Sequence, residues 1–365
     1  TNVSADTLNS VNTFDGTFAT STGWTTDSDW TISGGVATCN GNNSGRFMYP
    51  TSDRWTVGSS VVVEVTVTAY TSGTLNVSYS SGGATSGTSM TSTGTYKFLN
   101  NVSVNEVIYL RSDSFIGSID GVKIYYAEYD RSVSNKGLIP YGTITKSAVA
   151  TGAELVSYGP FSINNYLKQP YNSDLAFAAD DDWCFIIWAD GAADSELTPN
   201  SYTFSKGYYN GSTWLEYIDF RIRNNGDVNF EFKGTLGSGN FSSSRSITDN
   251  NWHQYVFLKR GSSNYEGYID GQLVGTTEAN VGAFNNTNSV LMVGTHHGNA
   301  AANSWDGSVA LFRVSASAPS PEQIKKIYED EKVLFQENTK ATLYGSSDAV
   351  TALGYDEDTE LLHVG

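Results

Sequence analysis

The segment 251–276, NWHQYVFLKRGSSNYEGYIDGQLVGT, constrains the fold of this 365-residue chain most strongly. It reads as strand, turn, strand, tight turn and strand, with aromatic and β-branched residues filling the strands. Asp270-Gly271 is typical of a type I′ hairpin turn, because both central residues of that turn need positive φ. The segment therefore predicts consecutive antiparallel strands.

The same strand pattern recurs along the chain. Period-two apolar positions occur at Val61, Val63, Val65 and Val67, and again at Phe220, Ile222, Val228, Phe230 and Phe232, which form one hairpin turned at 224–227. Further strands are expected within 30–40, 60–70, 74–81, 95–104, 107–112, 117–126, 180–190, 202–209, 290–296 and 305–315. The 36 glycines, the 13% aromatic content and the scarcity of helix formers agree with an all-β protein.

The chain is too long for one ordinary core, so we expect an all-β protein of two antiparallel sandwiches. We divide it into residues 1–128, 129–336 and 337–365. One helix is predicted at 320–335, where Ser320 and Gln323 form a capping box. Residues 341–365 predict a short β-hairpin tail, which we interpret as the start of a propeller-like repeat cut short.

The first sandwich resembles a known family of binding modules. FDGTFATSTGW (14–24), WTISGGVAT (30–38) and GSIDGVKIY (117–125) are similar to jelly-roll carbohydrate-binding modules with a galactose-binding-like fold. The resemblance implies a structural calcium held by Asp15 and Asp120, and oxygen ligands suit this ion. Asp15 stands where the family pattern usually has Asn, and an Asp in a turn also serves as a hydrogen-bonding cap.

The second sandwich resembles the laminin-G-like, concanavalin-A-like lectin superfamily, in its pentraxin-like branch. The resemblance is carried by Trp252-His253, Tyr268-Ile269-Asp270-Gly271, the strand from Asp182-Trp183 to Trp188, and Asp306-Gly307 leading into Phe312-Arg313-Val314. The order of the domains, with the segment 164–177 and the tail, is similar to virion structural and tail-fibre proteins of marine bacteriophages. It implies a virion or extracellular location, within a homo-oligomer such as a trimer or a larger virion assembly.

The net charge limits the classes of partner that the chain can bind, and the cysteine content limits its covalent cross-links. The net charge of −17 and the pI near 4.5 exclude nucleic acid and anionic membranes, and favour a neutral glycan or a divalent cation. No apolar run approaches the roughly 18 residues of a membrane span. Cys39 and Cys184 fall in different halves of the chain, so we expect buried free thiols rather than a disulfide framework.

Catalytic patterns of this fold are missing from the sequence. Retaining glycosidases of the fold place two carboxylates on one strand face as Glu-x-Asp-x-Glu or Glu-x-Asp-x-x-Glu, and neither spacing occurs. Glu231 stands alone on its strand, and no Gly-x-Ser-x-Gly elbow joins a strand to a helix. We therefore expect no enzyme, and a hydrolase or lyase is the least favoured alternative.

Aromatic and polar side chains in loops are the binding candidates, because sugar rings stack on aromatic faces. We select Tyr49 and Trp55 as an exposed platform in the first sandwich, and Tyr208, Tyr209 and Trp214 at a hairpin tip in the second. His296 and His297, in a Gly/Asn-rich loop, could be solvated, contact a glycan or bind a metal, although no third metal ligand is evident. Trp24, Trp30, Trp305 and His253 match structural positions. We expect a non-catalytic carbohydrate-binding or adhesion module; the alternative is a purely architectural virion protein.

Overall fold

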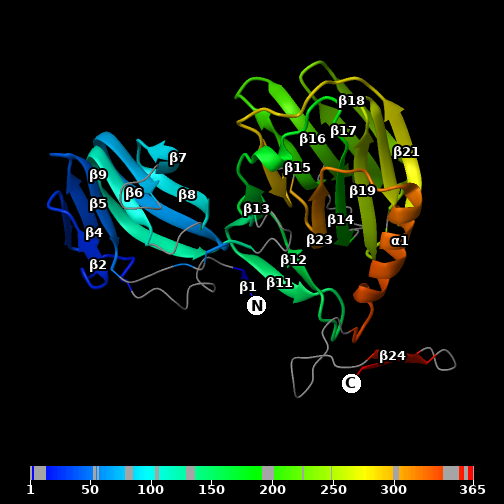
Figure 1. The fold of residues 1–365 in the computed structure, drawn as a ribbon, viewed down its shortest axis with the longest axis horizontal. Helices are drawn as coiled ribbons and strands as arrows, with labels where there is room; N and C mark the ends of the chain where they lie inside the picture. Colours follow the sequence, from blue (N-terminus) through cyan, green and yellow to red (C-terminus); the bar gives the residue numbers. More distant parts are fainter. Residues whose placement is uncertain are drawn as a thin grey trace.

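A computed structural model describes the chain apart from residues 1, 4–13, 52–54, 56, 79–84, 103–106, 129–135, 191–200, 224–225, 248, 299–303, 340–352, 357–360 and 365. It is nearly all β, with antiparallel sheets in two sandwich-like bodies and one helix near the C-terminal end (Figure 1). The predicted fold class is confirmed.

The first body is built on two long, bent strands. Its strands are β2 (Trp24–Thr26), β3 (Trp30–Ser33), β4 (Val36–Asn40), β5 (Ser44–Pro50), β6 (Ser60–Ser78), β7 (Thr85–Met90), β8 (Gly94–Asn101) and β9 (Tyr109–Tyr126). β6 pairs with β7, β8 and β9, and β9 also pairs with β4 and β5. The alternating valines Val61, Val63, Val65 and Val67 are all buried in its core, together with Trp24 and Trp30. The expected inward face of this strand is confirmed.

Two predicted strand breaks are absent from the structure. The sequence predicted separate strands at 60–70 and 74–81, and at 107–112 and 117–126, yet β6 and β9 are each continuous. The segments between the expected strands, 71–73 and 113–116, lie opposite each other where the register of the β6–β9 pairing shifts, and the pairing continues beyond them. Bulges of this kind let one strand serve both layers of a sandwich, and turn-forming residues alone do not reveal them.

The second body contains two facing sheets. The first runs β1 (Asn2–Val3), β11 (Ile144–Ala148), β12 (Val156–Gly159), β23 (Val309–Ser315), β14 (Trp183–Asp190), β19 (Trp252–Arg260), β20 (Asn264–Ile269) and β21 (Gln272–Glu278). The second runs β10 (Ile139–Tyr141), β13 (Tyr166–Gln169), β22 (Val290–Val293), β15 (Ser201–Tyr209), β16 (Trp214–Ile222), β17 (Asp227–Lys233) and β18 (Ser238–Ser246). Their inner faces share one aromatic core, in which the Phe185 and Phe204 rings stack with centroids 4.8 Å apart.

The segment that most constrained the fold forms the expected strands. It gives β19, β20 and β21, and the turn between the last two has φ of 51° at Asp270 and 72° at Gly271. Positive φ at both positions confirms the type I′ prediction. His253 on β19 is 6% exposed and lies 2.8 Å from a carboxylate oxygen of Asp270, so its predicted structural role is confirmed.

The predicted helix forms, and it covers the outer face of β14. α1 (Pro321–Lys332) continues into the short 3-10 helix η2 (Val333–Phe335), and a second 3-10 turn, η1 (Ser173–Leu175), lies earlier in the chain. Ser320 and Gln323 form the expected capping box. Trp188 stacks on Phe335, with centroids 4.3 Å apart, and its Nε1 donates to Glu331. The helix therefore seals a surface that the strand leaves apolar.

The two bodies touch through a small apolar contact (Figure 1). Val62 and Tyr125, on the face of β6 and β9 opposite the first core, pack with Ala127 and Ile139. Lys97 donates to the carbonyl of Pro140 at 3.0 Å. Alternation correctly assigned the core face of β6, but it gave no sign that Val62 on the other face is also buried.

The remaining elements fit the sequence predictions. β24 (Leu353–Asp356) and β25 (Leu361–Val364) pair as the predicted tail hairpin, whose turn lies outside the described residues. Cys39 and Cys184 are buried free thiols, and burial raises the pKa of Cys184 to about 12. Among the helices in the described ranges, none has the length and apolarity needed to cross a membrane.

Candidate functional site

Four of the predicted binding residues meet on the outer face of the second sheet. Tyr209 and Trp214 lie at the end of the β15–β16 hairpin, and His296 and His297 follow β22. The Trp214 ring centroid lies 4.2 Å from that of Tyr209, 4.7 Å from His296 and 5.0 Å from His297. The structure therefore joins a hairpin tip and a loop that the sequence presents as two separate candidates.

A bulge brings Trp214 to this face. Residues paired across β15 and β16 point to the same side, so Ser205 and Asp219 share the outer face while Phe204 and Phe220 share the core. The pairing then shifts, from Tyr208 opposite Glu216 to Tyr209 opposite Trp214. The extra residue reverses the alternation on β16, which places Trp214 above the histidines. Tyr209 is 38% exposed, whereas Tyr208 is half-buried and lies on the other face by alternation.

Beneath Trp214 the two histidines surround one buried carboxylate. Asp219 Oδ2 lies 3.3 Å from His296 Nε2, and Asp219 Oδ1 lies 3.5 Å from His297 Nδ1. The Ser205 hydroxyl donates to Asp219 Oδ1 at 2.6 Å and lies 2.5 Å from His297 Nδ1. Among the described residues, Asp219, His296 and His297 form the group of side chains that lie close enough together to hold a metal ion. The expectation that the histidine loop is solvated is wrong, because both rings are buried.

The hydrogen bonds assign the protons of the cluster. His296 Nδ1 accepts from the Gly298 amide at 3.1 Å, so Nε2 carries the ring proton and donates to Asp219. Because Ser205 donates its proton to Asp219, His297 Nδ1 must be the donor toward Ser205. Burial lowers the pKa of His297 more than the Asp219 charge raises it, so this imidazole is neutral.

Ser205, His297 and Asp219 do not form a nucleophilic triad. In such a triad the histidine contacts the serine with one ring nitrogen and the carboxylate with the other. Here Ser205 and Asp219 both face Nδ1, and Nε2 has no partner in the described residues. Ser205 is also fully buried, so no substrate can reach its hydroxyl.

Two glycines make room for these rings. A Cβ at Gly207 would lie 2.7 Å from His297 Nε2 and 2.4 Å from the Glu216 carbonyl oxygen. A Cβ at Gly298 would lie 2.1 Å from the Trp214 ring. The histidine loop therefore fits between the sheet and Trp214 only because Gly207 and Gly298 lack a side chain.

A pair of neighbouring carboxylates on this face is not accessible to a sugar linkage. Asp219 and Glu231 are direct cross-strand partners on β16 and β17. Burial raises the pKa of Glu231. The charge of Arg221, the ion-pair partner of Glu231, partly offsets this rise. Asp219 is 3% exposed and its oxygens accept from His296 and Ser205. A glycosidase needs both carboxyl groups open to the bond being cleaved, and the histidine loop closes off one of them.

The first-body candidates do not form a common platform. Trp55 is 5% exposed and packs edge-on against Tyr126, so its predicted exposure is wrong. Its flanking residues are polar, but the ring completes the core of the first body. Tyr49 is half-buried on β5, where its ring centroid lies 4.8 Å from that of Tyr109.

Asp15 and Asp120 occupy different settings. The Asp15 carboxylate accepts from the Thr17 amide at 3.0 Å and from the Thr20 amide at 2.7 Å, which is the arrangement of a turn cap. Hydrogen bonds from Thr17 and then Thr20 lower the pKa of Asp15. Asp120 is exposed on β9. Calcium at these residues stays a prediction, which thermal melting with and without EDTA would test.

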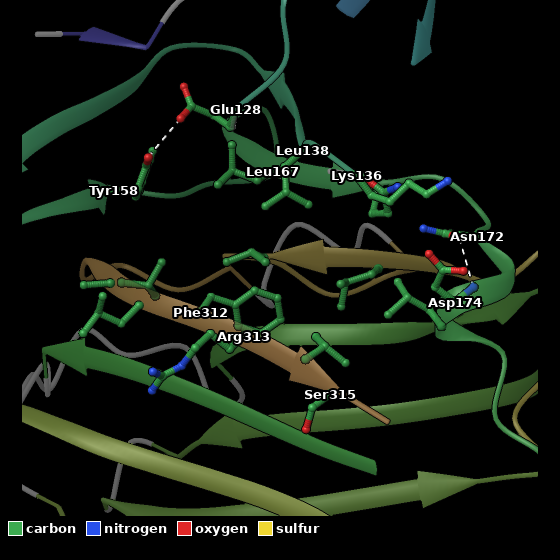
Figure 2. A pocket seen from close by; sticks show the side chains of 18 of the residues that line it. Glu128, Lys136, Leu138, Tyr158, Leu167, Asn172, Asp174, Phe312, Arg313 and Ser315 are labelled. Atoms are coloured by element: carbon green, nitrogen blue, oxygen red, sulfur yellow. Dashed lines mark hydrogen bonds between the residues drawn. The ribbon is translucent and has the colours of Figure 1, made fainter. Parts of the chain in front are cut away.

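Apart from the outer-face site, a hollow of about 700 Å³ lies between the two sheets of the second body (Figure 2). Its walls are mainly aliphatic and aromatic, and include Leu138, Leu167, Leu291, Val293, Val309 and Phe312. The Glu128–Tyr158 hydrogen bond lies at one end and Asn172 at the other. Sugar hydroxyls on these apolar walls would lose their hydrogen bonds to water, at about 1–3 kcal/mol each. This hollow is therefore poorly suited to a glycan, and the outer-face site is the better candidate.

Sequence reasoning missed Asp219, Ser205 and Tyr202, whose ring centroid lies 4.5 Å from that of His296. The one available signal was alternation, which places Asp219 and Ser205 opposite the apolar positions of their strands. No sequence pattern showed that the histidine loop would cover them.

Comparison with known proteins shows what the second body is similar to. Residues 162–325, a little under half of the chain, match a laminin G model of the concanavalin A-like lectin/glucanases superfamily. No curated protein matches the sequence.

Several solved structures resemble the chain in part. The binding domain of Paraclostridial Mosquitocidal Protein 1 is 12% identical with a TM-score of 0.44, covering 55% of this chain and 49% of that one. The botulinum neurotoxin serotype G binding domain is 13% identical with a TM-score of 0.44, covering 56% and 48%. A heptameric SAP-like pentraxin from Limulus polyphemus is 15% identical with a TM-score of 0.33, covering 46% and 84%. The match spans about half the length of the first two structures.

Proposed function

We propose that this chain is a non-catalytic carbohydrate-binding module, and that the Tyr209–Trp214 surface contacts the sugar. The observation that carries the proposal is an exposed ring, Tyr209, packed on a half-buried one, Trp214, above a rigid support. Tyr209 is 38% exposed, and Trp214 packs against it on one side and against two buried histidine rings on the other. A ring fixed in this way can stack on the C–H face of a sugar without losing rotamer freedom on binding.

Polar groups beside the aromatic pair suit hydroxyl recognition. The turn 210–213 joins the two strands, and Asn210 Oδ1 already accepts from the Thr213 amide at 2.8 Å, which holds the turn in shape. The exposed turn residues can exchange water for sugar hydroxyls at little cost. The net charge of −17 repels anionic polysaccharides, so the proposed ligands are neutral glycans.

Affinity electrophoresis against neutral and sulfated polysaccharides tests the proposal. We expect retardation by a neutral polysaccharide, and a loss of roughly tenfold or more in affinity for Trp214→Ala, equivalent to about 1.4 kcal/mol. Tyr49→Ala is the matched control, because it removes a half-buried aromatic ring from the first body. A folded Trp214→Ala variant that binds as tightly as the wild type would exclude this surface.

The resemblance in domain order supports a place on a virion or tail fibre, within an oligomer or larger assembly. Labelling of purified particles with antibodies against this chain tests that setting, and antibody confined to the particle-free fraction contradicts it. A folded chain that binds none of the glycans but labels particles would favour the architectural alternative. Release of reducing sugar by the wild type would instead support a hydrolase.

A further inference from the structure

The buried group Asp219, His296 and His297 has the spacing of a metal site. Ligands about 2.0–2.1 Å from a tetrahedral zinc ion lie roughly 3.3 Å from one another. Asp219 Oδ2 lies 3.3 Å from His296 Nε2, and Asp219 Oδ1 lies 3.5 Å from His297 Nδ1. One ligand atom from each of the three residues lies within 4.8 Å of the other two, so side-chain movements could bring all three onto one ion.

The donor types around the buried carboxylate also suit a metal. Asp219 is 3% exposed, and its ion pairs in the described part of the chain involve histidines alone. Lys206, on the same strand as Ser205, bonds to Glu216 at 2.9 Å instead. Carboxylate, imidazole and hydroxyl groups are typical ligands of a divalent transition-metal ion.

We propose that Asp219, His296 and His297 bind one divalent transition-metal ion, zinc by preference, with the Ser205 hydroxyl or a water as fourth ligand. Imidazole and carboxylate ligands in tetrahedral arrangement select zinc over calcium or magnesium, which prefer six or more oxygens. The ion takes the place of the two protons now directed at Asp219 and Ser205. Each imidazole stays neutral, with its proton on the other nitrogen.

Binding of the ion would alter the aromatic surface above it. With zinc on Nε2, His296 carries its proton on Nδ1, where the Gly298 amide now donates at 3.1 Å. Two N–H groups cannot face each other, so Gly298 must turn away. Gly298 lies against the Trp214 ring, so zinc should move the ring that the proposed function assigns to sugar contact. An effect of zinc on the affinity for sugar therefore rests on the proposed function, whereas zinc binding itself does not.

Metal binding is tested directly on the full chain. After EDTA treatment and its removal, the protein is titrated with Co²⁺ and Zn²⁺ in excess Mg²⁺, which occupies weak carboxylate sites. We expect one equivalent bound, a visible Co²⁺ absorption typical of four ligands, and a higher melting temperature with Zn²⁺. Asp219→Asn and His296→Asn should each weaken binding by roughly a hundredfold.

His253→Gln is the matched control, because it alters a histidine–aspartate contact elsewhere and should leave metal binding unchanged. If Asp219→Asn fails to fold, His296→Asn decides the outcome. A wild type that binds no Zn²⁺ or Co²⁺ overturns the proposal, as does unchanged binding in folded Asp219→Asn or His296→Asn. The Trp214→Ala variant separates the two proposals, since it should lose glycan affinity and still bind the metal.

Discussion

Two histidine–aspartate groups in the second body share residue types but differ in environment. His253 on β19 lies 2.8 Å from Asp270 and 2.8 Å from Asp249, at sequence separations of 17 and 4. Asp270 is also paired with Arg245, and Asp249 is largely exposed. By contrast, the Asp219–His296–His297 cluster is joined through Ser205 and His297, which are 92 residues apart, and among the described residues the ion pairs of its buried carboxylate include no arginine.

The difference shows that environment decides what the same side chains do. The His253 group has enough positive charge to balance its carboxylates, so it behaves as a structural brace for the hairpin. The Asp219 carboxylate is buried, and in the described part of the chain its ion pairs involve histidines alone. A buried carboxylate paired with neither arginine nor lysine is the better candidate for a binding role.

Removal of the buried carboxylate should give the largest effect on stability. In EDTA, Asp219→Ala should lower the free energy of unfolding by about 3 kcal/mol, because His296 and Ser205 lose their buried acceptor. Urea denaturation followed by circular dichroism measures this. A loss below about 1 kcal/mol would mean that the cluster contributes no more than an exposed pair.

Filling the space beneath His297 should have the next largest effect. Gly207→Ala places a methyl group 2.7 Å from His297 Nε2 and 2.4 Å from a backbone carbonyl, so we expect a loss of about 2 kcal/mol. Gly237→Ala is the control, since nothing lies within 4 Å of its added Cβ. Equal melting temperatures for the two variants would show that the histidine loop is not held against the sheet.

The His253 brace should make stability depend on pH. Burial opposes ionisation of His253, but hydrogen bonds to Asp270 and Asp249 outweigh it and raise its pKa above the ordinary 6.5. The protonated His253 therefore adds its full contribution to the free energy of unfolding below pH 6.5. This contribution is lost as the pH rises through the higher folded-state pKa.

Comparison with His253→Gln isolates this contribution. The stability difference between wild type and variant should be larger by about 1 kcal/mol at acid pH than at alkaline pH. Urea denaturation across the pH range, on both proteins, measures it. A difference that is constant with pH would show that His253 is not charged in the folded chain.

A change at Asp249, the exposed partner of His253, should have the smallest effect on stability. The Asp249 side chain is 52% exposed, so Asp249→Asn should change stability by less than about 0.5 kcal/mol near neutral pH. The same denaturation assay checks this value. A change as large as that of Asp219→Ala would remove the contrast between the two groups.

The sequence predicted the fold more fully than the site. The strand pattern of 251–276, the Asp270-Gly271 turn and the Ser320 capping box depend on contacts within a few residues, and each formed as expected. The first-body site prediction failed at Trp55, because a tryptophan in a polar segment can still turn inward when the core has space for it. The sequence selected Tyr209 and Trp214 at a hairpin tip and, separately, His296 and His297 in a loop, and it gave no sign that the two sets are neighbours.

By itself, the sequence determined the local periodicity, the tight turn and the helix start, because these follow from backbone geometry and side-chain alternation over short distances. Only the tertiary structure decided that Trp214 faces outward, since a bulge reverses the alternation on β16. It also decided that the histidine loop covers Asp219, because contacts between distant segments depend on how strands pair and sheets pack, which no local pattern encodes.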